Sequence, residues 1–521
     1  MDKNNLNDNQ TSNTSMAVLL VSVFIIATCG ILYELLISTI STYFLGSSIL
    51  HFSITIGLFM SAMGIGSYLS KYIDNQLLKR FIQIEIWLGL IGGLSAFLLF
   101  FAYSLTENYH LIAFCLIVLL GTFIGLEIPL VTRIVKEYTT LKDTIAQVLS
   151  FDYIGALVAS VVFPLILLPY LGTMRTGFLV GILNLSVAVF NLIIFKNQLK
   201  NFVYRRLMTP TIGIILILVS GFVYSFKITS FFEQFIYQDE VIFAEQSPYQ
   251  RIVLSKWKDD IRLYINGNLQ FSTIDEYRYH EPLVHIPMAV TPNHQKVLVL
   301  GGGDGFAVRE LLKWTDIQEI TVIDLDPVIT NLGKKNPLFR KLNHNSFNSP
   351  KVKIINEDAF NFISNTSEKY NCVIIDLPDP NDTGLGKLYS KEFYEILKKT
   401  LTADGVMVTQ ATSPYFAREA FWCIKHTLES VFTNIEPYTT YVPSFGQWGY
   451  VLASKQTIDK SKILDKIIAR NLTLKHISKA SFVSFFSFEP DISEIPTKTN
   501  LLDNQSLVEY YEAATQKWEQ E

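Results

Sequence analysis

Acidic side chains follow four successive apolar runs in the C-terminal half of this 521-residue sequence. They are Asp304 in LGGGDG, Asp324 in VIDLD, Glu357 and Asp358 in NEDA, and Asp376 and Asp379 in DLPDP. One acidic residue after a strand is often a helix N-cap or a turn residue, but four in succession are hard to explain by capping. Such a group of carboxylates favours a cationic ligand over a dinucleotide with its anionic pyrophosphate. It suits a sulfonium nucleoside together with an amine.

The glycine-rich turn LGGGDG adds a backbone feature to this acidic group. Gly301 and Gly303 allow a ligand to come close to the main chain, and Asp324 follows about 20 residues later, where an acidic residue commonly accepts hydrogen bonds from ribose hydroxyls. Glu357 and Asp358 stand where an adenine amine could donate. Together these positions predict a nucleoside site.

The elements that must position these residues alternate between strand and helix over residues 291–460. KVLVLGG, EITVIDLD, VKIINED, YNCVIIDLPDP and GVMVTQA are apolar and strand-like, and amphipathic segments separate them. This alternation predicts an α/β, Rossmann-like domain with a doubly wound parallel sheet. In such sheets ligands bind beyond the carboxyl ends of the strands, where all the acidic motifs fall.

Two further segments flank this predicted core. Residues 240–290 begin with alternating runs around the turn Ile265-Asn266-Gly267, which predicts a small antiparallel β domain, and end in a helical stretch. Residues 461–521 are expected to form a helical C-terminal extension that acts as a cover or an assembly element.

The first half of the chain has a different composition. The sequence is 49% hydrophobic and 17% charged, against about 25% charged in a typical soluble domain. Residues 1–15 are polar and are expected to be a disordered tail, and residues 16–226 are predicted to form a multi-helix transmembrane domain of about seven spans. The predicted spans are 16–38, 44–68, 82–104, 109–130, 148–169, 173–195 and 208–226.

Loop charges give a topology that conflicts with the chemistry. Three loops near residues 71–80, 133–142 and 196–206 carry the basic residues and fall on one side, which the positive-inside rule places in the cytoplasm. With seven helices, residues after 226 are then outside, whereas nucleoside chemistry favours the cytoplasm. The sequence predicts a multi-pass protein of the cell (inner) membrane. It does not decide on which side of the membrane the catalytic part lies.

Three carboxylates, Glu34, Glu127 and Asp152, lie in or at the ends of the predicted spans. Ionisable groups at membrane depth often mark a pathway or a binding site for cations. The alternative interpretation is that they pair with Arg133 or with a backbone group near the interface. Both interpretations remain open at this point.

Charge and cysteine content exclude other classes of function. A net charge of −4 argues against a nucleic-acid binder, which would carry a basic patch. The four cysteines include no CxxC pair, so neither a metal site nor a disulfide framework is expected.

Residues 240–455 resemble the polyamine aminopropyltransferases, that is, the spermidine and spermine synthases. The motifs that carry the resemblance are GGGDG, YHE at 279–281, the acidic end of VIDLD, EDA and DLPDP. With the preceding helices, ATSPYFAREAFWCI and VPSFGQWG, the chain is similar to the membrane-fused bacterial branch of that family. The resemblance implies a small β domain before a Rossmann-like core of methyltransferase type, and a homo-oligomer.

The resemblance also implies the reaction and its participants. Aminopropyl would pass from decarboxylated S-adenosylmethionine, a co-substrate rather than a permanently bound cofactor, to a diamine with putrescine as the default, leaving methylthioadenosine. Gln250 and Gln270 match family positions near the nucleoside. Asp304 would face the aminopropyl ammonium, Asp324 the ribose and Asp358 the adenine.

On the amine side, Tyr279 and His280 match a pair that helps to hold the acceptor. Asp376 matches the base that deprotonates the attacking amine, and Asp379 a second carboxylate that grips it. A protonated amine is not a nucleophile, so a carboxylate has to orient it and accept its proton. Tyr441 in YVPSFGQWG is a candidate for a late amine-pocket tyrosine, one residue out of register with the family segment.

The sequence departs from the family pattern mainly around the amine. Leu377-Pro378 replace the usual Ser/Thr pair between the two aspartates, and Ile265-Asn266-Gly267 replaces the usual L-D-G. The acceptor is therefore less well specified than the nucleoside. Two alternatives remain open: an S-adenosylmethionine-dependent methyltransferase, and a polyamine sensor or transporter that uses the membrane carboxylates.

Overall fold

The computed structural model describes residues 3–45, 48–106, 108–237 and 239–520. The chain divides into two compact units, residues 1–255 and 256–521. The boundary falls inside a strand of the small sheet, and each unit is described by itself below.

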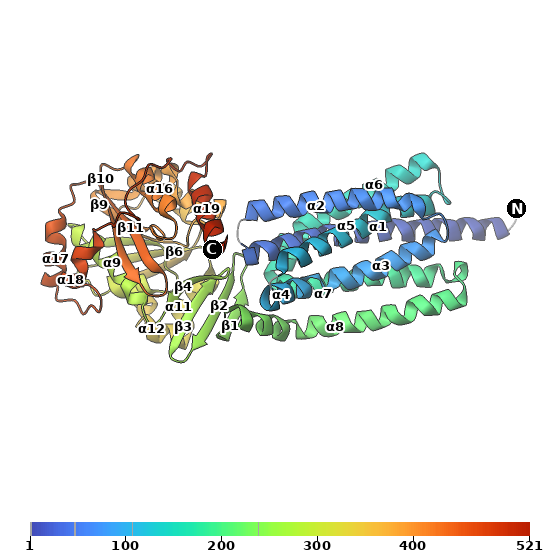
Figure 1. Ribbon diagram of the computed structural model, residues 1–521, viewed down its shortest axis with the longest axis horizontal. Helices are drawn as coiled ribbons and strands as arrows, with labels where there is room; N and C mark the ends of the chain where they lie inside the picture. The colour runs from blue at the N-terminus through green and yellow to red at the C-terminus, as the bar shows by residue number, and fades with distance from the viewer. Residues whose placement is uncertain (1–2, 46–47, 107, 238, 521) are drawn as a thin grey trace. The chain divides into compact units, whose positions relative to one another are not determined.

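The first unit consists mainly of long helices that lie side by side (Figure 1). α1 packs against α2, α5, α6 and α7, α2 packs closely on α5, and α7 contacts α3 and α8. The helices are α1 (Lys3–Leu45), α2 (Ser48–Leu69), α3 (Leu77–Gly93), α4 (Ser95–Leu105), α5 (Tyr109–Val135), α6 (Leu141–Val162), α7 (Leu168–Ile194) and α8 (Asn201–Tyr237).

In the described part of the chain, six helical stretches are long and apolar enough to cross a membrane, by length and composition. One of them, Leu141–Ile194, contains both of the spans predicted for 148–169 and 173–195. Gly172 interrupts it with φ 71° and ψ 179°, a conformation that glycine adopts readily and that breaks the helical path. The sequence thus predicted seven spans where the described residues give six stretches, and the span predicted for 44–68 includes residues 46–47, which lie outside the described residues.

The N-terminal residues differ from the expectation of a disordered tail. Helix α1 begins at Lys3, so residues 3–15 continue the apolar part of the helix towards the N-terminus, and residues 1–2 lie outside the described residues. Extending an existing helix is much easier than nucleating a new one, and the segment contains no glycine or proline to stop it.

Helices α2 and α5 approach each other at paired glycines. A Cβ on Gly66 would lie 2.0 Å from the carbonyl oxygen of Thr122, and one on Gly125 would lie 2.0 Å from that of Met63. A larger residue at either position would force the two helices apart. This contact fixes the distance between α2 and α5, and α5 is the helix that carries Glu127.

The small sheet contains β1 (Glu240–Gln246), β2 (Arg251–Trp257), β3 (Asp260–Ile265) and β4 (Asn268–Ser272), in this order. β3 and β4 are antiparallel. Asn266 and Gly267, between them, have φ of 48° and 83°, as expected for an Asn-Gly hairpin turn. The predicted β domain is therefore present.

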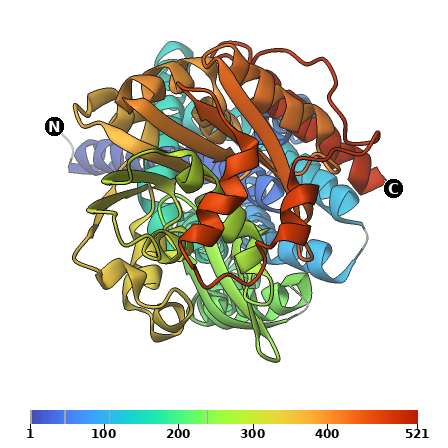
Figure 2. The same ribbon diagram turned by 90° about the vertical axis from the view of Figure 1, so that its left-hand side faces the viewer.

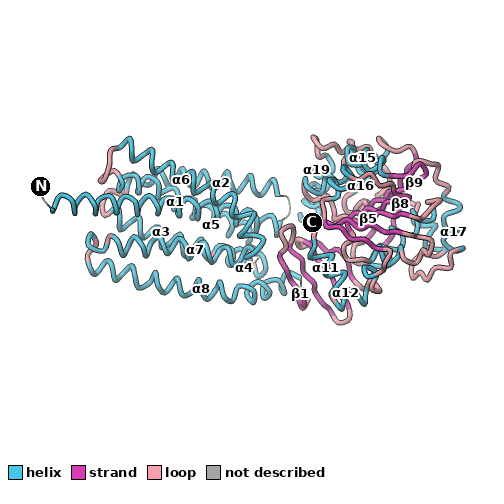
Figure 3. Tube along the Cα trace, turned by 180° about the vertical axis from the view of Figure 1, so that it is seen from behind, coloured by secondary structure: helices cyan, strands magenta, loops and turns pink. Residues whose placement is uncertain are grey.

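The larger sheet has seven strands in the order β10-β11-β9-β8-β5-β6-β7. β5 to β9 are parallel, as the sequence predicts for a Rossmann-like domain, and the antiparallel hairpin β10–β11, which the sequence analysis did not predict, extends the sheet beyond β9. Figure 3 shows β5, β8 and β9 next to one another. The strands are β5 (Lys296–Gly301), β6 (Glu319–Asp324), β7 (Val352–Asn356), β8 (Tyr370–Asp376), β9 (Leu401–Gln410), β10 (Asn434–Val442) and β11 (Gly446–Ser454).

Helices cover this sheet on both faces. Along β5, Val297 and Val299 belong to one hydrophobic cluster while Leu298 and Leu300 belong to another, because successive side chains of a strand point to opposite faces. The helices are α9 (Glu276–Val290), α10 (Phe306–Leu311), α11 (Pro327–Lys335), α12 (Pro337–Leu342), α13 (Ala359–Asn365), α14 (Thr383–Gly386), α15 (Lys391–Thr400) and α16 (Arg418–Glu429).

The C-terminal extension has three short helices, α17 (Ile463–Ala469), α18 (Lys479–Phe485) and α19 (Ser506–Gln520), with long non-helical segments between them. α17 packs on α9, α18 on β10 and α19 on α16. Figure 2 shows α17 and α18, in orange-red, in front of the sheet. Glu281 fastens this extension, since its carboxylate accepts hydrogen bonds from the backbone N–H groups of Lys475, His476 and Ile477 at 2.7, 2.9 and 3.1 Å.

Candidate active site

The glycine turn after β5 lies directly against the end of β8. Gly301 is in register with Asp376, and the N–H of Gly302 donates to the backbone oxygen of Asp376 at 3.1 Å. Gly301 and Gly302 have φ of 83° and 64°, and a Cβ on Gly301 would lie 2.0 Å from that same oxygen. Only a glycine fits there, so the sequence of the turn brings Asp376 next to the loop.

The next residues of the turn bring in the end of β6. The N–H of Gly303 donates to Asp324 Oδ2 at 3.0 Å, and a Cβ on Gly303 would lie 2.5 Å from this oxygen. The N–H of Asp326 donates to Asp324 Oδ1 at 2.9 Å. Burial raises the pKa of Asp324 to about 7 despite these two hydrogen bonds. The carboxylate is thus fixed in orientation, and it keeps unused lone pairs.

Asp304 and Asp376 form the centre of the acidic group. The N–H of Phe306 donates to Asp304 Oδ1 at 2.8 Å, and the hydroxyl of Tyr279 donates to Asp376 Oδ1 at 2.7 Å. Burial raises the pKa of Asp304 to about 6, and the charge of Asp376 contributes in the same direction. Burial likewise raises the pKa of Asp376, against the effects of His280 and Tyr279. Each of these two carboxylates disfavours the charge of the other, and a cation bound next to them would favour both charges.

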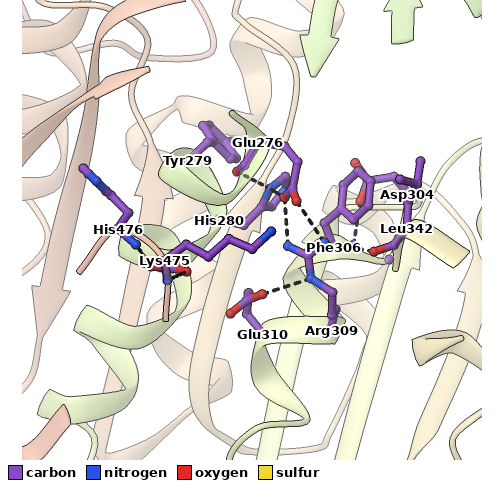
Figure 4. Close-up of polar contacts among 12 residues, drawn as sticks. Glu276, Tyr279, His280, Asp304, Phe306, Arg309, Glu310, Leu342, Lys475 and His476 are labelled. Atoms are coloured by element: carbon purple, nitrogen blue, oxygen red, sulfur yellow. Dashed lines mark hydrogen bonds and ion pairs between the residues drawn. The ribbon is translucent and has the colours of Figure 1, made fainter. Parts of the chain in front are cut away.

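His280 is held by a buried ion network (Figure 4). Its Nδ1 lies 2.8 Å from the backbone oxygen of Glu276 and 3.0 Å from Glu276 Oε2, so Nδ1 carries a proton. Arg309 donates two hydrogen bonds to the same carboxylate at 2.9 and 2.8 Å. Burial opposes a charge on His280, but Glu276, with the charges of Asp304 and Asp376, raises its pKa to about 9.

The sequence analysis did not identify Glu276 and Arg309 as site residues. Glu276 contacts His280, Arg309 contacts Glu276, and neither residue belongs to a motif that the sequence analysis used. Burial would raise the pKa of Glu276, but His280 and Arg309 lower it to about 2. A carboxylate that is charged at every physiological pH therefore keeps the imidazole ring oriented.

Asp379 has partners from distant parts of the sequence. The hydroxyl of Tyr511, in α19, donates to Asp379 Oδ2 at 2.9 Å, and Gln410 Nε2 lies 3.4 Å from Oδ1. Gln410 also donates to the backbone oxygen of Leu377 at 2.8 Å, within the DLPDP segment. Burial raises the pKa of Asp379 to about 6, and the hydrogen bond from Tyr511 opposes this rise. Neither Tyr511 nor Gln410 was identified from the sequence.

Asp358 follows β7, and each of its carboxylate oxygens accepts a hydrogen bond. Its Oδ1 accepts from the N–H of Asn361, which caps α13, and its Oδ2 accepts from Lys387 Nζ at 2.8 Å. Burial would raise the pKa of Asp358, but the bond with Lys387 lowers it. The backbone N–H of Glu357 donates to the backbone oxygen of Asp324 at 3.2 Å, which joins the ends of β7 and β6.

Polar contacts also involve three further predicted residues, Tyr441, Gln270 and Gln250. Tyr441 is 57% exposed, and its backbone oxygen accepts from Arg278 at 3.2 Å. Gln270 is directed towards the backbone oxygen of Asn268 at 3.1 Å. Gln250 belongs to the first unit, where its N–H donates to Ser247 Oγ at 3.0 Å.

The segment around Tyr441 contributes through other residues. The rings of Phe445 and Trp448 lie 6.3 and 6.2 Å from that of Tyr279, and Trp448 Nε1 is buried without a partner among the described residues. VPSFGQWG therefore supplies an aromatic wall beside Tyr279.

One other group has the spacing of metal ligands. The ligand atoms of His426, Glu429 and Glu494 lie within 4.8 Å of one another. Lys425 Nζ lies 2.6 Å from Glu429 and 2.7 Å from Glu494, so an ammonium group already neutralises these carboxylates. The arrangement is an ion-pair network at the surface.

Comparison with known proteins shows which family this chain resembles. Residues 276–464 match the spermine/spermidine synthase domain. A polyamine aminopropyltransferase of Leptospira interrogans is 42% identical over 494 residues, covering 95% of this chain and 98% of the relative. Polyamine aminopropyltransferase 1 of Ralstonia nicotianae is 41% identical over 96% of each chain, and a relative from Oceanobacillus iheyensis is 39% identical over 95% of this chain and 96% of its own.

Among solved structures, the spermidine synthase of Thermotoga maritima has 27% identity and a TM-score of 0.45, covering 48% of this chain and 84% of its own. The sequence relatives match over both units of this chain. The chain therefore belongs to the polyamine aminopropyltransferase family and is an enzyme of aminopropyl transfer in polyamine biosynthesis, in the form that carries an additional N-terminal helical unit.

Proposed function

We propose that this enzyme transfers the aminopropyl group of decarboxylated S-adenosylmethionine to a diamine such as putrescine, with Asp376 as the base. The observation that carries the proposal is the placement of Asp376, which accepts from the Tyr279 hydroxyl at 2.7 Å and has a pKa raised by burial. A base with a raised pKa accepts a proton more readily.

In this reaction the ammonium of the acceptor gives its proton to Asp376. The freed nitrogen lone pair then attacks the aminopropyl carbon bonded to the sulfonium sulfur. The new C–N bond forms as the C–S bond breaks, and the bonding pair leaves with sulfur to give neutral methylthioadenosine. Because the leaving group is already cationic, no acid is needed, and positioning with charge placement supplies most of the rate.

The amine groups would be held by the carboxylates around Asp376. Asp379, oriented by Tyr511, would bind one ammonium of the diamine, and Asp304 would face the ammonium of the aminopropyl group. A bound ammonium lowers the pKa of each carboxylate and restores its charge. Tyr279 and His280 would form the wall between the two, and Tyr441 stays a prediction.

On the nucleoside side, Asp324 would accept the ribose hydroxyls. Both of its oxygens already accept one backbone N–H, which fixes their direction and leaves further lone pairs. Asp358 would accept from the adenine amine while Lys387 holds its other oxygen. Gln250, Gln270 and Glu357 stay predictions for the same ligand.

The test is incubation of the purified full chain with decarboxylated S-adenosylmethionine and a series of diamines, with product masses as the readout. We expect methylthioadenosine and the matching aminopropylated amine in equal amounts. The parallel reaction contains S-adenosylmethionine, whose carboxylate Asp304 should disfavour. Methylated amine in that reaction, without aminopropyl product in the first, would contradict the proposal.

We also propose that the first unit is embedded in the cell membrane. The length and apolar character of its helices support this, as do large exposed apolar side chains such as Tyr153, Leu157 and Leu165. Alkaline extraction of membranes should leave the chain in the pellet. Asp491 is an exposed loop residue, so labelling an Asp491→Cys variant with an impermeant maleimide in intact and broken cells would tell the two sides apart.

A further inference from the structure

A cavity of about 70 Å³ lies among α1, α2, α5 and α6 of the first unit. On the same measure one water needs roughly 10–15 Å³, so the cavity has room for several waters or for a short aliphatic chain. Three carboxylates line it, those of Glu34, Glu127 and Asp152, and the rest of its wall is apolar, with Phe59, Met63 and Ile124. None of the described residues that line it is basic.

Glu127 is the most constrained of the three carboxylates. It is 1% exposed, no described residue donates a hydrogen bond to either of its carboxylate oxygens, and its side chain interacts with the carboxyl of Glu85, another acidic group. A buried carboxylate without a partner is strongly unfavourable, because the loss of hydration is not compensated.

The residues that might have neutralised this group are used elsewhere. Arg133 donates to the backbone oxygen of Ser70 at 2.8 Å, and Arg175 donates to Ser225 Oγ at 2.9 Å. A further carboxylate, Glu85 of α3, is fully buried and accepts from Asn184 Nδ2 at 2.9 Å. Pairing with Arg133, one of the interpretations of the sequence, is thus not what the side chains do.

We propose that this cavity binds a protonated aliphatic diamine, at a site separate from the active site. Its ammonium groups would donate to Glu127 and to the carboxylates of Glu34 and Asp152, and its methylene groups would contact the apolar wall. Calcium and magnesium prefer about six or more oxygen ligands, whereas this wall is largely hydrocarbon. The site thus suits the chemical class that aminopropyl transfer consumes.

The test measures binding of radiolabelled 1,4-diaminobutane to the full chain in detergent, by equilibrium dialysis. The chain carries Asp376→Asn and Asp379→Asn, so that the active site no longer competes for the diamine. We expect close to one diamine bound per chain. Adding Glu127→Gln should weaken this binding at least tenfold, while the matched control Glu137→Gln, at an exposed position just after α5, should leave it unchanged.

A second variant tests the cavity without removing a charge. Ala156 lines the cavity, so Ala156→Leu should fill it and abolish binding of the diamine. The proposal is overturned if the Asp376→Asn, Asp379→Asn chain binds no diamine, or if either Glu127→Gln or Ala156→Leu leaves the affinity unchanged. It is also overturned if the chain instead retains sodium-22 in a Glu127-dependent way that the diamine does not displace.

Discussion

Asp376 and Glu127 are both carboxylates in the interior of this chain, one in the α/β unit and one in the helical unit. Asp376 accepts from the hydroxyl of Tyr279, and its neighbours Asp304 and Asp324 accept from backbone N–H groups. No described residue donates a hydrogen bond to either oxygen of Glu127, whose side chain interacts with the carboxyl of Glu85, another acidic group. The protein fixes the direction of the first carboxylate before any ligand arrives, and leaves the second to be satisfied by whatever enters the cavity.

The two carboxylates differ in this way because a catalytic base and a ligand-binding group have different requirements. A base has to stand within hydrogen-bond reach of one particular proton, so its orientation must be set in advance. A binding group needs only to be compensated by its ligand, and its unsatisfied state supplies part of the selectivity for cations. Substitutions in the two units should therefore differ in kind as well as in size.

The largest effect is expected for Asp376→Asn. The amide cannot take the proton from the ammonium, so turnover should fall by roughly 10²–10⁴-fold, the usual contribution of a general base. Binding of the nucleoside should stay close to that of the native enzyme, because the hydrogen bond that joins the glycine turn to residue 376 uses its backbone oxygen. Calorimetry with methylthioadenosine beside single-turnover rates measures both. An equal loss of binding and rate would remove Asp376 from the chemistry.

A smaller loss is expected for Tyr279→Phe. The phenol donates to a charged carboxylate, and such a hydrogen bond contributes about 1.5–3 kcal/mol, so kcat should fall by roughly 10–100-fold. The pKa of Asp376 should also rise, because this donor stabilises its charged form. The pH dependence of kcat records that shift. If kcat falls while its pH profile stays where it was, the hydroxyl does not act through Asp376.

Tyr511→Phe should act on substrate binding more than on turnover. Removing this donor raises the pKa of Asp379, whose value is about 6 with the hydrogen bond in place. Below that pH Asp379 carries a proton and loses its attraction for an ammonium, so kcat/KM for the diamine should fall as the pH is lowered through 6. In the variant this acid limb should move to higher pH, with KM raised and kcat nearly unchanged. An unshifted limb would mean that α19 only covers the site.

The smallest effect is expected for Glu127→Gln in the otherwise native enzyme. With saturating substrates, kcat should stay within about twofold of native, because the proposed mechanism gives Glu127 no part in the reaction. Steady-state assays with Glu137→Gln as the control measure this. A loss comparable with that of Tyr279→Phe would show that the two groups of carboxylates work on the same reaction.

The strand-end carboxylates could be predicted from the sequence because their signal is local. An apolar run followed by an acidic turn is visible within ten residues, and parallel strands bring their ends to one edge. Asp304, Asp324 and Asp376 are joined through the glycine turn in this way. The long helices could be predicted from hydropathy for the same reason, because a run of apolar residues is also a local signal.

The partners of these carboxylates could not be predicted, because they come from distant positions. Tyr511 lies 132 residues after Asp379, and Arg309 lies 33 residues after Glu276. Such pairs depend on how helices pack over the sheet, which no local periodicity encodes. Glu85 was missed for a related reason: a single acidic residue in an apolar run shows no sign of which helix it faces.

The contact between Tyr511 and Asp379 also has a consequence for the newborn chain. Ribosomes add roughly 5–20 residues per second, so the 132 residues between them take about 7–26 s to make. During that interval the helical unit, the glycine turn and the base are already synthesised, while the hydroxyl that orients the acceptor carboxylate does not yet exist. The carboxylate that we propose for the acceptor amine therefore lacks the hydroxyl that orients it until α19 has been synthesised and has packed in place.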